Sequence, residues 1–200
     1  MTAIIDYGAG NLHSVQNALM LLGEESVITG NPDEIAAAER VILPGVGSFG
    51  DAMARLRVSG LDKAVIDVAN SGKPLLGICL GLQLMFESSE ESPGVDGLGI
   101  FRGRVVKIPK IGDIKIPHMG WNNLTLTGES KILKGLGEEP YVYFVHSYYI
   151  NAEEDVVSAY TEYGQRLDIA AERGNVFALQ FHPEKSGGVG MQILKNFLAL

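Results

Sequence analysis

The sequence predicts an α/β fold in a single domain, 1–200, with a sheet that is parallel in its first half and mixed or antiparallel in its second. Up to about residue 87, short apolar strand patterns alternate with helical patterns, which is typical of a parallel sheet covered by helices on both faces. Beyond that point, strand patterns follow one another. Two hundred residues can bury one sizeable core, and no linker long enough to divide the chain occurs.

The first half contains four short apolar strand patterns, at 3–5, 26–29, 41–43 and 75–78. A helix after the first is expected to start at Asn11 and end at Gly23, because apolar residues recur between them at helical spacing. Pro32 favours the start of a second helix. Further helical patterns run through Met53 and Leu56, through Val65 and Ala69, and over 80–87.

The second half has strand patterns at 103–108, 141–145, 169–172 and 176–181. Arg173-Gly174-Asn175 is a hairpin-turn signal between the last two. Residues 191–200 are expected to form a terminal helix.

Composition excludes several classes of function. The formal net charge of −8 without a basic cluster argues against a nucleic-acid partner. A single cysteine allows no internal disulfide and no metal cage, so neither a metal nor another cofactor is expected, and a reducing compartment is. The N-terminus does not resemble a signal peptide and no apolar run is long enough to span a membrane, so we expect a cytoplasmic protein.

The single cysteine lies in Gly77-Ile78-Cys79-Leu80-Gly81, directly after an apolar run. Glycines two positions either side of a nucleophile permit a sharp strand-to-helix turn that presents its side chain at the end of a sheet. A free cysteine is also commonly a small buried hydrophobe, so this motif alone leaves both interpretations open.

The best candidate base for Cys79 is His182, in Gln180-Phe181-His182-Pro183-Glu184. In extended backbone, residues two apart share a face, so His182 and Glu184 are expected to lie side by side. The carboxylate would then orient the imidazole, which would deprotonate the thiol. Taken alone, this motif also fits a strand-end histidine beside a surface carboxylate.

The glycine-rich segment Pro44–Gly50 follows a strand, so it is expected at the same edge of the sheet as Cys79. Acyl transfer needs backbone N–H donors aimed at the developing oxyanion, and we expect them from Leu80 and from Val46 or Gly47. A plain tight turn is the alternative. A phosphate loop is disfavoured because the Gly-Lys-Ser/Thr ending is missing.

Together, Gly77–Gln83 and Phe181–Glu184 resemble the class I (triad) glutamine amidotransferases. Four further blocks resemble the branch of that family that serves histidine biosynthesis: Asp6–Leu12, Leu43–Gly50, Pro117–Asn122 and Phe144–Tyr148. The loops that mark the branches of pyridoxal phosphate and anthranilate synthesis are absent.

This resemblance implies a three-layer, flavodoxin-like fold and hydrolysis of glutamine through a thioester on Cys79. It implies that the amino-acid end of glutamine is held by Gln83, Glu91, His146, Ser147 and Tyr148. It also implies a heterodimer with a cyclase, a (β/α)8 barrel that uses the ammonia. Candidate interface residues are Asn11, Trp121 and Lys185; the alternative for Trp121 is core packing.

Three other functions remain open from the residues. One is the glutaminase subunit of a different amidotransferase. Another is a cysteine esterase or peptidase, although in α/β-hydrolases the acid precedes the histidine in the chain. The third is a non-catalytic binding subunit, which would be expected to have lost part of the triad.

Overall fold

The computed structural model describes all residues from Met1 to Leu200. Its main sheet has the strand order β2-β1-β3-β4-β13-β12-β10-β6-β5, with β11 and β8 continuing from β12. The first five strands run parallel. They are β2 (Ser26–Thr29), β1 (Thr2–Ile5), β3 (Arg40–Gly45), β4 (Leu75–Cys79) and β13 (Val176–Leu179). The predicted fold class is confirmed: this 2-1-3-4-5 order is that of flavodoxin-like sheets.

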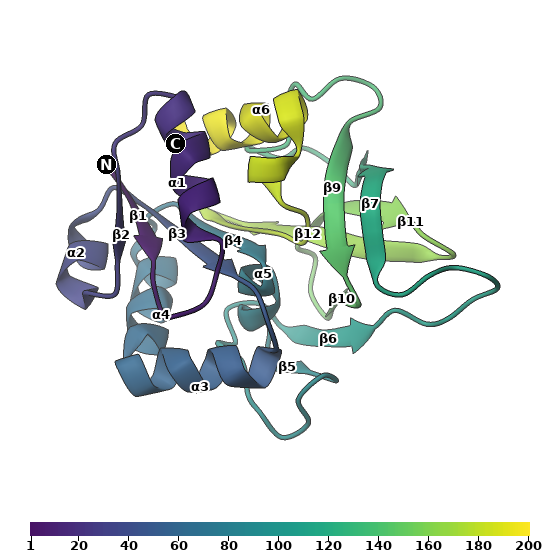
Figure 1. Ribbon diagram of the computed structural model, residues 1–200, viewed down its shortest axis with the longest axis horizontal. Coiled ribbons are helices and arrows are strands. Elements are labelled where there is room, and N and C mark those ends of the chain that lie inside the picture. The colour runs from purple at the N-terminus through teal and green to yellow at the C-terminus, as the bar shows by residue number, and fades with distance from the viewer.

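The rest of the main sheet is mainly antiparallel. It comprises β12 (Arg166–Arg173), β10 (Tyr148–Ala152), β6 (Gly103–Lys107), β11 (Val157–Glu162), β8 (Thr125–Leu126) and β5 (Ser88–Ser89), the last parallel to β6. A separate antiparallel pair is formed by β7 (His118–Asn123) and β9 (Tyr141–His146). This pair stands beside the main sheet, next to α6 (Figure 1).

Helices cover both faces of the parallel strands (Figure 1). One face carries α2 (Pro32–Ala37), α3 (Phe49–Ser59), α4 (Leu61–Ser71) and the short α5 (Leu80–Leu84), and the other carries α1 (Leu12–Leu21) and α6 (Gly187–Leu198). Along β1, Ala3 and Ile5 enter the first core and Ile4 enters the second. This alternation is the period of two of a strand with both faces buried.

The helix expected over 80–87 ends at Leu84. The reason is that the next carbonyls bond to the returning chain: Leu84, Met85 and Glu87 accept from the N–H groups of Leu98, Phe101 and Gly97, at 2.8, 3.0 and 2.8 Å. These tertiary hydrogen bonds replace the i→i−4 bonds that would have continued the helix.

Other boundaries also differ from the predictions. The terminal helix begins at Gly187, four residues before the predicted start. The prediction missed its first turn because that turn contains Gly187, Gly188 and Gly190, and glycine is a poor helix former. Asn11 does occupy the N-cap position of α1, but its side chain makes no capping hydrogen bond. Five strands were not predicted: β5, β7, β8, β10 and β11.

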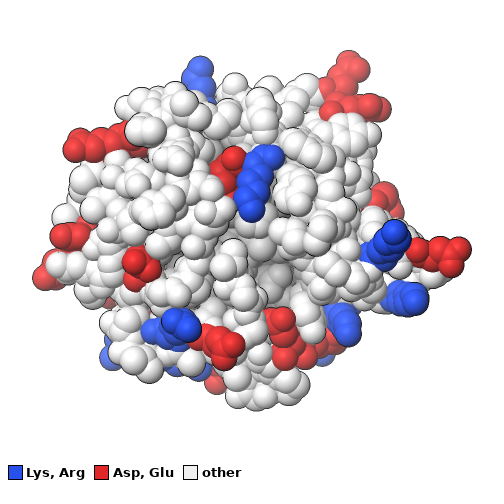
Figure 2. All heavy atoms as spheres, in the orientation of Figure 1, with Lys and Arg blue, Asp and Glu red and all other residues white.

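The acidic side chains are spread around the face shown in Figure 2, and the Lys and Arg side chains on it form no continuous patch. The chain has no helix with both the length and the apolar character that crossing a membrane requires.

Candidate active site

Cys79 ends β4 with backbone angles of φ 56° and ψ −109°, the only positive φ at a non-glycine residue. Such a conformation costs on the order of 1–3 kcal/mol and needs support from its surroundings. The flanking glycines give that support by permitting close packing. A Cβ on Gly81 would overlap the carbonyl group of Leu43 in β3, and one on Gly77 would lie 2.9 Å from the carbonyl carbon of Gly81. The strand-to-helix turn is therefore built as predicted.

His182 and Glu184 lie side by side, with 2.8 Å between Nδ1 and Oε1 and only 4% and 1% of their side chains exposed. The backbone conformation that brings them together is not the predicted extended one. β13 ends at Leu179, and Glu184 lies in a 3₁₀ turn, η1 (Pro183–Lys185), that begins directly after His182. Proline at the first position of this turn favours it, because its φ is already suitable and its missing N–H costs nothing there.

The imidazole of His182 is strongly basic for a buried group. Burial by itself lowers its pKa, but the hydrogen bonds and charges of Cys79 and Glu184 outweigh burial and raise the pKa to about 9. The ring can therefore retain a proton that the thiol gives up.

Cys79 and His182 come together because β13 lies parallel and adjacent to β4, with Leu179 opposite Ile78. Both strands end at the same edge of the sheet. Gln180, which was not among the predicted site residues, is fully buried directly after the end of β13. Its Nε2 lies 3.8 Å from the sulfur of Cys79, and its Oε1 accepts from Nε2 of Gln83 at 3.0 Å. A lone amide between apolar strand residues was the available signal.

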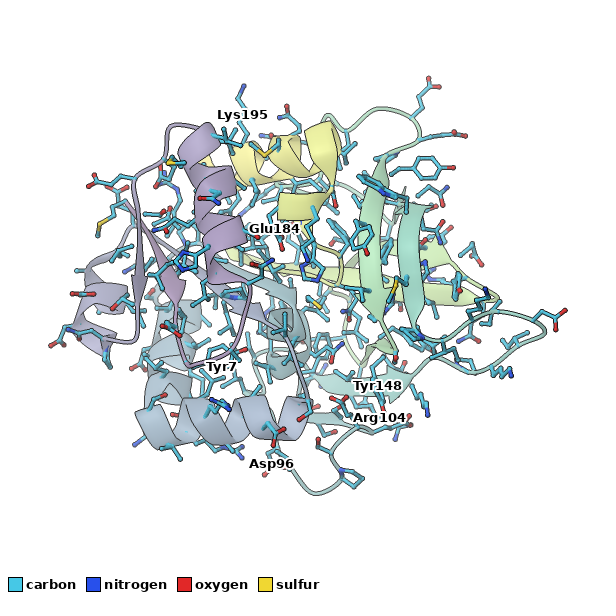
Figure 3. All side chains as sticks on the ribbon, in the orientation of Figure 1. Tyr7, Asp96, Arg104, Tyr148, Glu184 and Lys195 are labelled. Atoms are coloured by element: carbon cyan, nitrogen blue, oxygen red, sulfur yellow. The ribbon has the colours of Figure 1, made fainter.

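A cavity of about 420 Å³ opens in front of the thiol. It is lined by all the residues named above as catalytic, oxyanion-binding or substrate-binding, except Glu184, which lies behind His182: Val46, Gly47, Cys79, Leu80, Gln83, Glu91, His146, Ser147, Tyr148 and His182, with Pro117 and Val145. Gly47 has φ +99°, a conformation that favours glycine, and nothing stands where a Cβ would be. Figure 3 shows Glu184, Tyr148 and Tyr7 on separate segments of the chain around this edge of the sheet.

Glu91 has a structural partner at this cavity. Its Oε2 accepts from the backbone N–H of Phe49 at 2.7 Å, at the first residue of α3. A carboxylate is favourable at that position because unpaired N–H groups and the helix dipole both attract it. Glu91 thus fixes the end of the segment 46–48. Burial and the nearby carboxylates of Glu91 and Glu90 raise the pKa of Tyr148.

The candidate interface residues lie outside the cavity. Trp121 is 55% exposed, so it is not a core residue, and it packs edge-on against Tyr143 with 6.1 Å between ring centroids. Its ring reaches the start of α6, two residues beyond the exposed Lys185. Asn11 is half-buried at the start of α1, a helix that contacts η1.

A family model for class I glutamine amidotransferases matches residues 3–200. Imidazole glycerol phosphate synthase subunit HisH of Methanothermobacter thermautotrophicus is 50% identical, covering 100% of this chain and 98% of that protein. The HisH subunit of Moorella thermoacetica is 53% identical, covering 98% of this chain and 92% of that protein.

Solved structures share the fold at lower identity. A glutamine amidotransferase crystal structure superposes with a TM-score of 0.77 at 20% identity, over 98% of this chain and 97% of that one. PurLQS from Thermotoga maritima superposes with a TM-score of 0.76 at 23% identity, over 99% of this chain and 97% of that one. The chain belongs to the class I glutamine amidotransferases and, within them, to the HisH subunits of imidazole glycerol phosphate synthase.

Proposed function

We propose that this chain hydrolyses glutamine to glutamate and ammonia in the cavity in front of Cys79. Cys79 is the nucleophile, His182 is the base and then the acid, and Glu184 orients His182. The observation that carries this assignment is the thiol of Cys79, on a strained backbone, in one cavity with an imidazole whose Nδ1 is hydrogen-bonded to a buried carboxylate.

In the first step, His182 takes the thiol proton and the sulfur of Cys79 attacks the side-chain amide carbon of glutamine. The C=O bond becomes a C–O⁻ bond, stabilised by backbone N–H groups. We assign these donors to Leu80 and to either Val46 or Gly47, which line the same cavity as Cys79. Glu184 stabilises the imidazolium that forms, because a charge-assisted hydrogen bond is stronger than a neutral one.

The tetrahedral intermediate then collapses. His182 returns the proton to the amide nitrogen, the C–N bond breaks, ammonia leaves, and a thioester remains on Cys79. Water deprotonated by His182 attacks the thioester, and glutamate is released with the thiol restored.

The amino-acid end of glutamine is assigned to the polar wall of the cavity: Gln83, Glu91, His146, Ser147 and Tyr148. Glu91 suits the ammonium group because it is anionic, and its Oε1 is not used by Phe49.

Both relatives are subunits of a synthase, which supports a second chain as the acceptor of the ammonia. We assign that role to the cyclase subunit of imidazole glycerol phosphate synthase, which makes imidazole glycerol phosphate and aminoimidazole carboxamide ribonucleotide in histidine biosynthesis. The heterodimer would form in the cytoplasm through the surface that holds Asn11, Trp121 and Lys185.

The test uses the complex obtained by co-expression with the cyclase. Cys79→Ala is expected to abolish glutamate release from glutamine while leaving cyclase turnover with added ammonium unchanged, which also controls for folding and assembly. Wild-type complex should release glutamate faster when the cyclase holds its nucleotide substrate. Glutamate release that persists in Cys79→Ala would refute the assignment.

A further inference from the structure

Two buried histidines lie in contact at the polar wall of the cavity. His118 on β7 and His146 on β9 are register partners, 3% and 5% exposed, with 2.9 Å between Nδ1 of His118 and Nε2 of His146. His146 lines the cavity and His118 does not. Neither takes part in the bond-making and bond-breaking steps proposed above, and only His146 belongs to the wall assigned to glutamine.

The hydrogen bonds around this pair run in one direction, starting from Asn122. The carboxamide of Asn122 is oriented by two backbone groups: Oδ1 accepts from the N–H of Asn123 at 2.9 Å, and Nδ2 donates to the carbonyl of Glu162 at 3.0 Å. The other Nδ2 proton therefore faces Nε2 of His118, 3.4 Å away. That nitrogen must accept, so it carries no proton.

The remaining protons follow from this start. With Nε2 of His118 unprotonated, Nδ1 carries the proton and donates to Nε2 of His146. Nδ1 of His146 must then carry the second proton, and it donates to the carbonyl of Tyr148 at 2.8 Å. Both imidazoles are neutral with the proton on Nδ1. Burial lowers the pKa of His118 to about 4 and that of His146 to about 3, as a neutral pair requires.

The His118 ring is held in place by stacking. It lies 4.0 Å from the ring of Tyr163 and 4.7 Å from that of Phe144, each at an interplanar angle of 24°. The chain of hydrogen bonds that passes through His118 ends at the turn between β9 and β10, where Ser147 separates the two strands. The three residues at this turn, 146–148, all line the cavity.

We propose that His118 is a positioning residue for substrate binding: through His146 it fixes the carbonyl of Tyr148, and so the backbone of 146–148 that receives glutamine. This inference rests on the proposed function. Because the relay makes no hydrogen bond to Cys79, His182 or Glu184, it acts on the affinity for glutamine and leaves the chemical step unchanged.

The test is steady-state glutaminase kinetics of the complex with the cyclase. His118→Phe keeps the aromatic stack and removes both nitrogens. We expect roughly a tenfold rise in KM for glutamine, the effect of one buried hydrogen bond left unmade, and less than about a twofold change in kcat. Alkylation of Cys79 by iodoacetamide and ammonium-dependent turnover should stay at wild-type rates.

Two further variants sharpen the result. His118→Asn keeps an N–H donor toward His146 and should recover most of the lost affinity. Tyr163→Phe is the matched control: it keeps the ring stacked on His118 and removes only the hydroxyl that bonds to the carbonyl of Lys115, so KM should not change. An unchanged KM in His118→Phe, or a fall in kcat and alkylation rate equal to the rise in KM, would overturn the inference.

The tautomers give a readout that needs no variant. In ¹⁵N NMR of the wild-type imidazoles at neutral pH, both His118 and His146 should show protonated Nδ1 and unprotonated Nε2. A proton on Nε2 of either ring would contradict the relay. The Cys79→Ala result is independent of all these outcomes, so failure of the relay and failure of the proposed function are distinguishable.

Discussion

Gly81 is the position where a single methyl group should do most damage to the active site. A Cβ there would lie 3.0 Å from the carbonyl carbon of Leu43, with the carbonyl oxygen closer still, and 3.5 Å from Cγ of Leu43. The atoms that would have to move belong to the backbone of β3, which is hydrogen-bonded between β1 and β4. A flexible side chain could turn aside, but a central strand cannot.

The expected loss in free energy of unfolding for Gly81→Ala follows from that geometry. Overpacking a core costs about 1–3 kcal/mol where side chains can adjust, so about 3 kcal/mol is expected where only backbone can yield. Gly188 is the matched control, because it too is the second residue of a helix and has open space at its Cβ position. Gly188→Ala should be neutral or stabilise by up to about 1 kcal/mol.

Urea unfolding of both variants measures the difference, which should approach 3–4 kcal/mol and therefore about 1 M or more in midpoint for a slope near 3 kcal/mol/M. Glutaminase activity of Gly81→Ala in the complex should also fall, since α5 would be displaced from Cys79. Neutral surface substitutions change the free energy of unfolding by up to about 0.5 kcal/mol. If the free energy of unfolding of Gly81→Ala lies within that range of the wild-type value, the close-packing explanation of the glycine is wrong.

Three other predictions concern ionisable and buried polar groups. Glu184→Gln should lower kcat by about 100-fold or more, because the imidazolium loses its charged partner, whereas the exposed Glu139→Gln should have no effect on kinetics. Tyr7→Phe should leave stability unchanged or raise it by up to about 1 kcal/mol, because its hydroxyl is buried with no hydrogen-bond partner; thermal unfolding that shows a loss above 1 kcal/mol would contradict this. Stability should be greatest near pH 6.5. The native pKa values of His118 and His146, about 4 and about 3, lie below the ordinary 6.5, so stability falls as pH decreases from 6.5, by up to about 1.4 kcal/mol per unit for each ring. The pKa of His182, about 9, lies above it, so stability also falls as pH rises from 6.5 toward 9. In urea titrations, His118→Phe should flatten the acid limb and Glu184→Gln the alkaline limb.

The parallel half of the fold could be predicted from the sequence because its strands are buried on both faces and therefore appear as short apolar runs. β7 could not, for a physical reason. Its apolar residues Met119 and Trp121 point outward and are 62% and 55% exposed, while the polar His118 faces inward. Because apolar side chains of β7 face solvent and a polar one is buried, its sequence lacks the hydrophobic pattern by which a half-buried strand is predicted.

The candidate site divides in the same way. Cys79, His182 and Glu184 could be singled out because each occurs in a short motif with a chemical reason for its spacing. Gln180 and the His118 relay could not, because their partners are distant in sequence: Gln83 is 97 residues from Gln180, and His146 is 28 residues from His118. A short sequence motif predicts only local structure, whereas these contacts form only when β13 lies against β4 and β7 against β9.

The position of the site follows from the change in strand direction across the sheet. β4 is flanked by parallel strands on both sides, β3 and β13, so the carboxyl ends of three strands meet at one edge of the sheet. They bring the segment 46–48, the Cys79 turn and His182 together. The wall that faces them comes from the turn between β9 and β10, in the antiparallel half. The nucleophile therefore depends on backbone packing among the central strands, whereas substrate affinity depends on side-chain hydrogen bonds at the other side of the cavity. This separation is why changes at Gly81 should cost stability and catalysis together, and changes at His118 should alter KM alone.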